Sequence, residues 1–311
     1  MNHQPKIFKS NGKLLLTAEY AVLDGAKALA IPTRYGQRLI VEPNETDFIS
    51  WKSYNELGEV WFESRITYNE IATSNIKSET HRDVKIRLIQ ILKATKMLNS
   101  EFLSSNQGVS ITTEQDFNRL WGLGTSSTLI NNIADWASVD AYQLLEKTFG
   151  GSGYDIACAQ HDHAISFQLQ KPQEPLVASV AFQPNFKAHL YFVYLNQKQN
   201  SRDGISDYKK LGTINSEIIN QINRITESMI VCKSLKEFES LMESHETIIS
   251  TLIQQHPIKT RLFSDFNGAV KSLGAWGGDF ILVASQDNPT DYFNAKGFET
   301  VIPYVDMVLE S

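Results

Sequence analysis

The sequence is poor in cysteine, carries no excess of positive charge and has no long apolar run. Two cysteines among 311 residues cannot build a disulfide framework, so a reducing cytoplasm fits best. Lys and Arg number 29 against 35 Asp and Glu, a net charge of −6, whereas binding of nucleic acid usually needs a basic face. No stretch approaches the ~20 apolar residues of a membrane span. We expect a cytoplasmic protein whose partners are neither nucleic acids nor membranes.

The rest of the composition is that of a globular protein with a sizeable core, with 42% hydrophobic and 21% charged residues. Its length suits one large domain or two closely associated ones. The polar stretch 196–204 fits an exposed crossing, and helical periodicity dominates from 207 to 255. We therefore place a boundary near 187–204 and divide the chain into residues 1–190 and 191–311.

Hydrophobic periodicity predicts both strands and helices along the chain. Alternating aromatic and polar residues between 47 and 68 fit antiparallel strands. Apolar residues at near-helical spacing predict a helix over 85–98. Shorter helices are expected over 129–136, 139–148 and 154–161, and further strands over 13–23, 37–42, 109–113, 164–169, 176–182 and 189–195.

A glycine-rich turn in the middle of the chain feeds the helical stretch 129–136, and it reads Gly122, Leu123, Gly124, Thr125, Ser126 and Ser127. Glycines allow positive φ and a close backbone approach to a ligand, and a helix start offers N–H groups and a positive dipole end to an anion. The hydroxyls could add donors or hold a phosphate-bound Mg²⁺. The turn is not a Walker A loop, because no Lys-Ser/Thr pair follows the glycines. A glycine turn with a Ser or Thr cap and no ligand is the alternative.

Three other segments carry related signals: Gly12–Gly25 near the start, Gly151–Ala157 in the middle and Lys271–Asp279 near the end. Together with the glycine-rich turn, and in this order, they resemble the signature blocks of the GHMP small-molecule kinases. That family includes galactokinase, homoserine kinase, mevalonate kinase and phosphomevalonate kinase. The resemblance covers the whole length. It departs from the family at Trp276, where glycine is usual, and in the missing proline before the turn.

The resemblance implies an α+β fold of two domains. The N-terminal domain would be of the ribosomal-protein-S5-like type and the C-terminal domain α+β, with the active site in the cleft between them. It also implies ATP-dependent phosphoryl transfer to a small molecule, with Mg²⁺ as the metal. Residues 122–127 would hold the nucleotide, and the chain would be a monomer or a homodimer.

The resemblance also assigns catalytic and metal roles. Asp155 matches the family's catalytic aspartate, as a base or as the group that orients the acceptor hydroxyl, although an acidic residue in a first helical turn is also a common capping device. Lys13 would lower the acceptor's pKa or hold the transferred phosphate; a solvated surface lysine is the alternative. Ser126 matches the metal-binding serine, with Glu146 or Glu19 as the second oxygen ligand.

A wider group of residues is expected at the acceptor. Trp276 would narrow the site or stack on the substrate, or else pack between the domains. Two metal-like patterns are set aside: Cys158, His161 and His163 fit a packed helix end, and His245 fits a helix surface or core edge. The expected substrate residues are Lys9, Glu19, Tyr20, Gly153, Gly274, Ala275, Trp276, Gly277 and Gly278.

Three details favour phosphomevalonate, in the mevalonate pathway of isoprenoid biosynthesis, as the acceptor. Tyr20 follows Glu19, an aromatic residue precedes Asp155, and Asp279 follows two glycines, as is typical of phosphomevalonate kinases. The second phosphate would need extra cations, for which Lys9, Arg34, Arg38 and Lys271 are the candidates. Mevalonate, or a sugar or homoserine, is the alternative acceptor. A diphosphomevalonate decarboxylase and a non-catalytic ligand-binding relative are the remoter alternatives.

Overall fold

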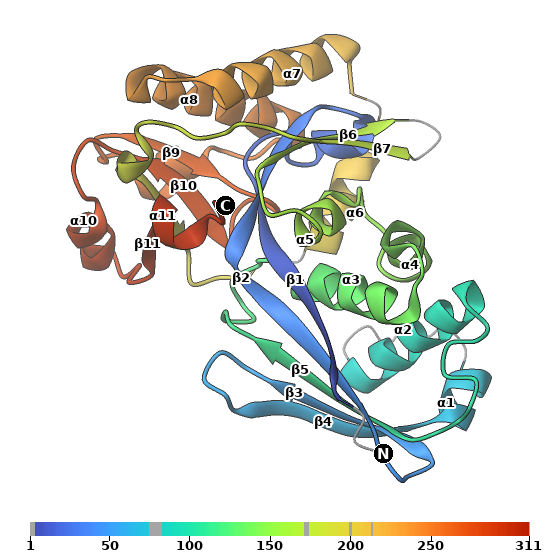
Figure 1. The fold of residues 1–311 in the computed structure, drawn as a ribbon. Coiled ribbons are helices and arrows are strands. Elements are labelled where there is room, and N and C mark those ends of the chain that lie inside the picture. The colour runs from blue at the N-terminus through green and yellow to red at the C-terminus, as the bar shows by residue number, and fades with distance from the viewer. Residues whose placement is uncertain (1–3, 75–82, 171–173, 199–200, 213, 311) are drawn as a thin grey trace. The chain divides into compact units, whose positions relative to one another are not determined.

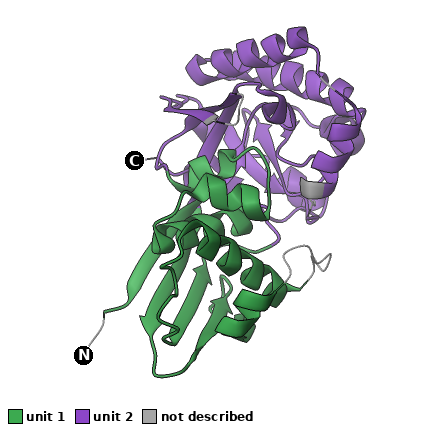
Figure 2. Cartoon of the chain, turned by 90° about the vertical axis from the view of Figure 1, so that its right-hand side faces the viewer, with its two compact units in different colours: residues 1–12, 35–119, 124–160 green, residues 13–34, 120–123, 161–311 purple. Residues whose placement is uncertain are grey.

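A computed structural model describes residues 4–74, 83–170, 174–198, 201–212 and 214–310. The chain forms two compact units that alternate along the sequence (Figure 2). Strands β1 (Lys6–Leu15) and β2 (Ala28–Pro43) each run from one unit into the other. Unit 1 comprises residues 1–12, 35–119 and 124–160, and unit 2 comprises residues 13–34, 120–123 and 161–311.

Unit 1 is built on strands that pair in the order β4-β3-β5-β2 (Figure 1). The hairpin of β3 (Phe48–Tyr54) and β4 (Val60–Thr67) matches the antiparallel strands predicted between 47 and 68. β5 (Val109–Gln115) is parallel to β3 and antiparallel to β2. The helices are α1 (Tyr68–Thr73), α2 (Val84–Leu98), α3 (Thr125–Ala137), α4 (Ala141–Thr148) and α5 (Tyr154–Ala159).

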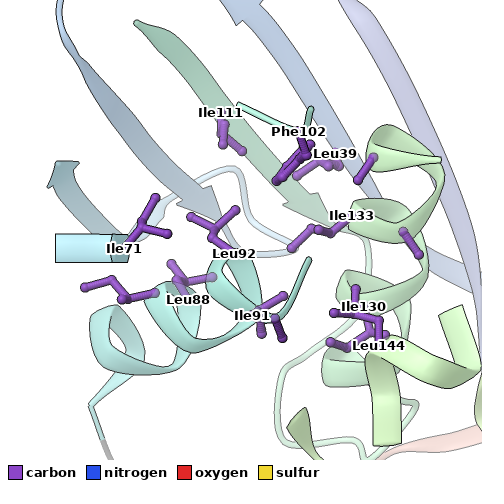
Figure 3. Close-up of a cluster of buried hydrophobic side chains, with 14 of the residues drawn as sticks. Leu39, Ile71, Leu88, Ile91, Leu92, Phe102, Ile111, Ile130, Ile133 and Leu144 are labelled. Carbon is purple, nitrogen blue, oxygen red and sulfur yellow. The ribbon is translucent and has the colours of Figure 1, made fainter. Parts of the chain in front are cut away.

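The core of unit 1 lies between one face of these strands and helices α2, α3 and α4 (Figure 3). Side chains i, i+3 and i+4 on a helix share a face, and on α2 this face buries Leu88, Ile91 and Leu92 in the core. Asp83 caps α2 and Asp140 caps α4 through their carboxylates, which fixes where each helix begins. The buried set includes Leu39, Trp51, Leu88, Ile91, Leu92, Ile111, Ile130, Ile133 and Leu144.

Unit 2 contains a four-stranded antiparallel sheet in the order β11-β8-β10-β9. The first residues of β2 also pair here with β6 (Ile165–Gln170), and β6 pairs with β7 (Glu174–Ser179). The sheet strands are β8 (Leu190–Tyr194), β9 (Ala269–Ser272), β10 (Phe280–Ala284) and β11 (Val301–Pro303). The helices are α6 (Ser201–Lys210), α7 (Ser216–Val231), α8 (Leu235–Ile253), α9 (Ile258–Leu262), α10 (Thr290–Ala295) and α11 (Tyr304–Met307), with 3-10 turns η1 (Ala21–Asp24) and η2 (Lys187–His189).

The predicted α+β class is confirmed, and one predicted strand is wrong in its second half. The sequence predicts a strand over 13–23, but β1 ends at Leu15. Ala18 and Tyr20 then adopt positive φ, 64° and 61°, and η1 follows. Apolar residues in this stretch are buried in a strained turn and not in a sheet, a distinction that hydrophobicity alone does not make.

The division into residues 1–190 and 191–311 stays a prediction. The two compact units divide the chain at other places, and position 190 is the first residue of β8, inside unit 2. Cys158 and Cys232 are both buried, and neither is part of a disulfide. Among the described residues, no helix has both the length and the apolar character to cross a membrane.

Candidate functional site

The glycine-rich turn opens helix α3 as the sequence predicts. Gly122 and Gly124 have φ of 70° and 96°, and Gly124 is the N-cap residue of α3. No described side chain caps this helix start. Helix N–H groups without a cap, at the positive end of the dipole, are suited to bind an anion.

The three hydroxyls of the turn differ in what they contact. Thr125 Oγ1 accepts a hydrogen bond from Gln115 Nε2 (3.0 Å), and Ser127 is buried and donates to the carbonyl of Gly124 (2.9 Å). Ser126 is exposed in the first turn of α3. Of the three, Ser126 therefore has the hydroxyl best placed for a ligand.

Lys13 is bound to the glycine-rich turn. Its backbone N–H donates to the carbonyl of Leu123 (3.0 Å), and its Nζ donates to the carbonyl of Gly122 (2.9 Å). The side chain is half-buried. The structure thus does not support the alternative of a freely solvated lysine, and it places an ammonium group at the turn.

Asp279, at the end of the third signature block, packs directly on the same turn. A Cβ placed on Gly122 would lie 2.4 Å from Cγ and Oδ2 of Asp279, so a side chain there would force Asp279 to move, and φ of 70° also favours glycine. Asp279 has φ of 54°, a left-handed conformation, and its backbone is held at both ends. Its N–H donates to the carbonyl of Gln197 (2.7 Å), and its carbonyl accepts from the N–H of Leu195 (2.8 Å).

Asp155 lies in the first turn of α5 in unit 1. The N-cap residue is Gly153, with φ of 90°, and a Cβ there would lie 2.9 Å from the ring of Tyr142. Asp155 is half-buried and is not the capping residue of this helix. Burial raises the pKa of Tyr142 to about 12, and the charges of Cys158, Asp140 and Asp155 add to that increase.

Glu19 lies at the centre of a buried cluster in unit 2. Its carboxylate accepts a hydrogen bond from Lys271 Nζ, and its Oε2 is 3.6 Å from Nε2 of His245. Glu19, Lys271 and His245 have no exposed surface. A substrate could reach Glu19 only if unit 2 rearranged, so the structure supports an internal role and not the predicted contact with substrate.

The neighbours of Glu19 complete this cluster. The N–H of Ala18 donates to Nε2 of His245 (2.9 Å), so that nitrogen carries no proton. Burial and the Lys271 charge lower the pKa of His245 well below its usual value. The adjacent Glu246 accepts hydrogen bonds from the Oγ (2.8 Å) and N–H (3.0 Å) of Ser272. The interpretation of His245 as a helix-surface or core-edge residue is therefore wrong: it is fully buried and holds the first signature block.

Tyr20 connects the first and third signature blocks. Its hydroxyl donates to the carbonyl of Ala275 (2.8 Å), and its ring stacks on Tyr208 of α6 with centroids 5.4 Å apart. The Tyr208 hydroxyl in turn donates to Asp24 (2.6 Å). Tyr20 is buried. Each residue of the strained turn 18–20 thus has a hydrogen-bond partner. Ala18 bonds to His245, Glu19 to Lys271, and Tyr20 to Ala275.

The third block contains a run of left-handed residues and a buried indole. Gly274, Trp276 and Gly277 have φ of 58°, 48° and 82°, and Trp276 is 1% exposed. A Cβ on Gly274 would meet no atom within 4 Å. An indole that is almost fully buried has no face for a ligand to stack on, so the structure favours packing over substrate stacking for Trp276.

The cations expected to bind a second phosphate are not equally available. Lys271 is buried against Glu19, Arg38 forms an ion pair with Glu114 (2.9 Å), and Arg34 donates to the carbonyl of Val305 (2.8 Å). Lys9 is exposed. The expectation that Lys271 contacts the acceptor needs correction, because a lysine at zero exposure is committed to its internal partner.

The chain matches known proteins by structure but not by sequence. No family model matches the chain, and no curated protein matches it. Solved structures do match. The mevalonate kinase of Methanococcus jannaschii is similar over 100% of both chains, with a TM-score of 0.73 and 15% identity. The phosphomevalonate kinase of Streptococcus pneumoniae, solved with phosphomevalonate and AMPPNP, is similar over 98% of both chains, with a TM-score of 0.65 and 16% identity.

The chain has the GHMP-kinase fold. A third match extends the fold beyond the two isoprenoid kinases: the galactokinase of Lactococcus lactis, solved with galactose, covers 96% of this chain and 94% of its own, with a TM-score of 0.63 and 11% identity. The predicted fold class is confirmed on this finding. Proteins with the GHMP-kinase fold act on different acceptors, so the fold does not by itself select one.

The oxygen atoms that could hold a hard cation lie in three places. Ser126 offers an exposed hydroxyl, Glu146 an exposed carboxylate on α4, and Asp279 a carboxylate on the turn at Gly122. Among the described residues, no three His, Cys, Asp or Glu side chains converge as a metal site. Few protein oxygens suit Mg²⁺, which keeps several waters and uses one or two carboxylates plus substrate phosphates.

Glu19 leads to a test of the buried cluster. Burial raises its pKa to about 7, more than the Lys271 charge lowers it. The folded state therefore holds this proton more tightly than the unfolded state does, and the stabilisation is present below pH 4.5 and lost as pH rises through 7. The free energy of unfolding of the parent minus that of Glu19→Gln should fall by up to ~3 kcal/mol between pH 4.5 and 8, measured by urea unfolding. A difference that stays constant with pH would contradict this assignment.

Proposed function

We propose that the chain is a GHMP-family kinase that transfers the γ-phosphoryl group of ATP to a small-molecule acceptor. One observation carries this proposal: the uncapped start of α3, with the Lys13 ammonium bound to the turn that precedes it. An anion of high charge would find both helix N–H groups and a cation there. The GHMP-kinase fold over the whole chain supports the proposal.

Catalysis of this reaction consists mainly of positioning and charge neutralisation. The turn 122–127 would cradle the triphosphate. Lys13 would stabilise charge that develops on the transferred group, and Asp155 would accept the proton of the acceptor hydroxyl as its oxygen bonds to phosphorus. Mg²⁺, held by Ser126 and a carboxylate such as Glu146, would neutralise phosphate charge. The breaking bond would release ADP.

The acceptor we propose is phosphomevalonate, with a role in isoprenoid biosynthesis. The support is the similarity of the Glu19-Tyr20 pair, the segment ending in Asp155 and the Gly277-Gly278-Asp279 run to phosphomevalonate kinases. One observation favours mevalonate as a second candidate: the buried Lys271 removes a cation that the extra phosphate of phosphomevalonate would use. We further propose that the protein is cytoplasmic and acts as a monomer or homodimer.

A screen for ADP release separates these acceptors. The purified protein with ATP and Mg²⁺ is offered mevalonate, phosphomevalonate, homoserine and hexoses in turn. Turnover that is fastest with phosphomevalonate supports the proposal, and turnover with mevalonate alone supports the second candidate. Release of CO₂ from diphosphomevalonate would instead identify a decarboxylase. Absence of turnover with every acceptor would leave a ligand-binding relative as the better description.

Ser126→Ala should weaken the use of Mg²⁺ and ATP more than the binding of the acceptor, because it removes the exposed hydroxyl at the helix start. We expect the Mg²⁺ concentration for half-maximal rate and the KM for ATP to rise several-fold, on the scale of one lost ligand contact of about 1–2 kcal/mol. The control is Ser240→Ala on α8, whose hydroxyl only bonds to its own helix at Lys236. Unchanged Mg²⁺ and ATP dependence in the Ser126 variant would remove it from the metal site.

A further inference from the structure

Asp279 places a negative charge next to the turn that we propose binds the phosphates of the nucleotide. Its carboxyl group lies against Gly122, whose carbonyl binds Lys13 and whose turn opens α3. A carboxylate beside a phosphate-binding turn repels the phosphate oxygens of a nucleotide. The Lys13 ammonium at the same turn attracts these oxygens, and the charge of Asp279 subtracts from that attraction. A divalent cation between the carboxylate and the phosphates would reverse the effect of Asp279.

The backbone of Asp279 is held on both sides. Its N–H and carbonyl bind Gln197 and Leu195, in a left-handed conformation that aspartate tolerates better than most residues with a side chain. Its charge also acts on its surroundings, since it adds to the effect of burial in raising the pKa of Tyr194.

The carboxyl group of Asp279 occupies the space that a side chain at position 122 would need. Any side chain at Gly122 would overlap the carboxyl group, and φ at Gly122 is also in the glycine region. The close approach therefore brings the carboxylate to the backbone of the turn itself. Mg²⁺ in phosphoryl-transfer sites is commonly bound by one or two carboxylates together with substrate phosphates.

We infer that Asp279 makes nucleotide binding depend on the divalent cation, by repelling metal-free nucleotide and attracting the Mg²⁺ complex at the glycine-rich turn. The inference rests on the proposed function and deepens it. Under this inference, Asp279 is a further carboxylate near the cation, besides the Ser126 and Glu146 that the sequence motifs assign to it. The third signature block thereby gains a role at the nucleotide. Asp279 and Lys13 both act on the nucleotide through their charges.

The test measures equilibrium binding of ATP in the absence of acceptor, by calorimetry, once with Mg²⁺ and once with EDTA. The quantity of interest is the Mg²⁺ enhancement, the ratio of the Kd in EDTA to the Kd in Mg²⁺. Asp279→Asn keeps the shape of the side chain, and asparagine tolerates the left-handed conformation. We expect the variant to bind metal-free ATP more tightly and Mg²⁺-ATP more weakly than the parent, so that the enhancement falls by about 10-fold or more.

Two further variants make the result decisive. Asp279→Gly removes the charge together with the rest of the side chain, and glycine adopts positive φ freely, so this variant should give the same fall in enhancement. Asp265→Asn changes a carboxylate of unit 2 that binds Tyr292 and Lys296, and it should leave the enhancement as in the parent. Folding of each variant is checked by its thermal transition.

The outcomes separate this inference from the proposed function. If the parent protein binds ATP with a strong Mg²⁺ enhancement and Asp279→Asn retains it, the inference is wrong and the proposed function stands. If both Asp279 variants weaken ATP equally with and without Mg²⁺, Asp279 only supports the turn, and the inference is again wrong. A parent protein that binds no ATP under either condition overturns the proposed function itself.

Discussion

Asp155→Asn should lower turnover by about 10²-fold or more while the fold and the binding of nucleotide are retained. The substitution is nearly isosteric and removes the group that would accept the acceptor's proton, and loss of a general base costs 10²–10⁴-fold. A 10²-fold fall corresponds to about 2.7 kcal/mol of transition-state stabilisation. Steady-state turnover and an ATP-binding titration on the same preparation measure the two quantities.

The alternative for Asp155 is a structural contribution at the start of α5, and a matched variant distinguishes the two. Asp140→Asn changes the carboxylate that caps α4 in the same unit, and asparagine is an equally good cap. Both carboxylates contribute to the raised pKa of Tyr142, so both variants change the electrostatics of the same tyrosine. We expect near-normal turnover in Asp140→Asn. Near-normal turnover in Asp155→Asn as well would show that Asp155 only favours the helix start.

Trp276→Gly should lower the free energy of unfolding by 3–5 kcal/mol, the cost typical of deleting a large buried aromatic side chain. The indole is 1% exposed, so its removal leaves a cavity. Glycine recovers part of this loss, because φ of 48° is strained for tryptophan and unstrained for glycine. Urea unfolding followed by circular dichroism measures the change, and Trp276→Phe should lose much less.

The same variant tests the idea that the indole faces the acceptor. In that case Trp276→Gly would change the KM or the choice of acceptor far more than the KM for ATP, with little loss of stability. Binding of the acceptor would also change the tryptophan fluorescence of the parent protein, and this change would be missing in the variant. The burial in the structure favours the loss of stability, and a stable variant with altered acceptor kinetics would overturn it.

The local features of the candidate site could be predicted from consecutive residues. Gly122 and Gly124 predict a turn with positive φ, and the apolar periodicity after them predicts a helix, as α3 confirms. Gly153 and the segment after it likewise predict the start of α5 and place Asp155 in its first turn. Turn and helix-start preferences act within a few residues, so a short string is enough to specify them.

Where local signals are ambiguous, the sequence predicts less of the structure. The apolar residues after Leu15 fit a strand by composition, and only the contacts of residues 18–20 show why the backbone turns there. Tyr20 reaches Ala275 from 255 positions away along the chain, and Ala18 reaches His245 from 227. No pattern around His245 indicates this role, because its neighbours on α8 are typical of an ordinary amphipathic helix.

The sequence by itself determined the α+β class, the glycine-rich turn before α3 and the order of the signature blocks. Only the tertiary structure decided that Glu19 and Lys271 bind each other in the interior, that Trp276 is buried, and that Asp279 lies on Gly122. The reason is physical. Backbone preferences are set by adjacent residues, whereas the partner of a buried charge depends on which distant segments the fold brings together, and burying that charge unpaired would be costly.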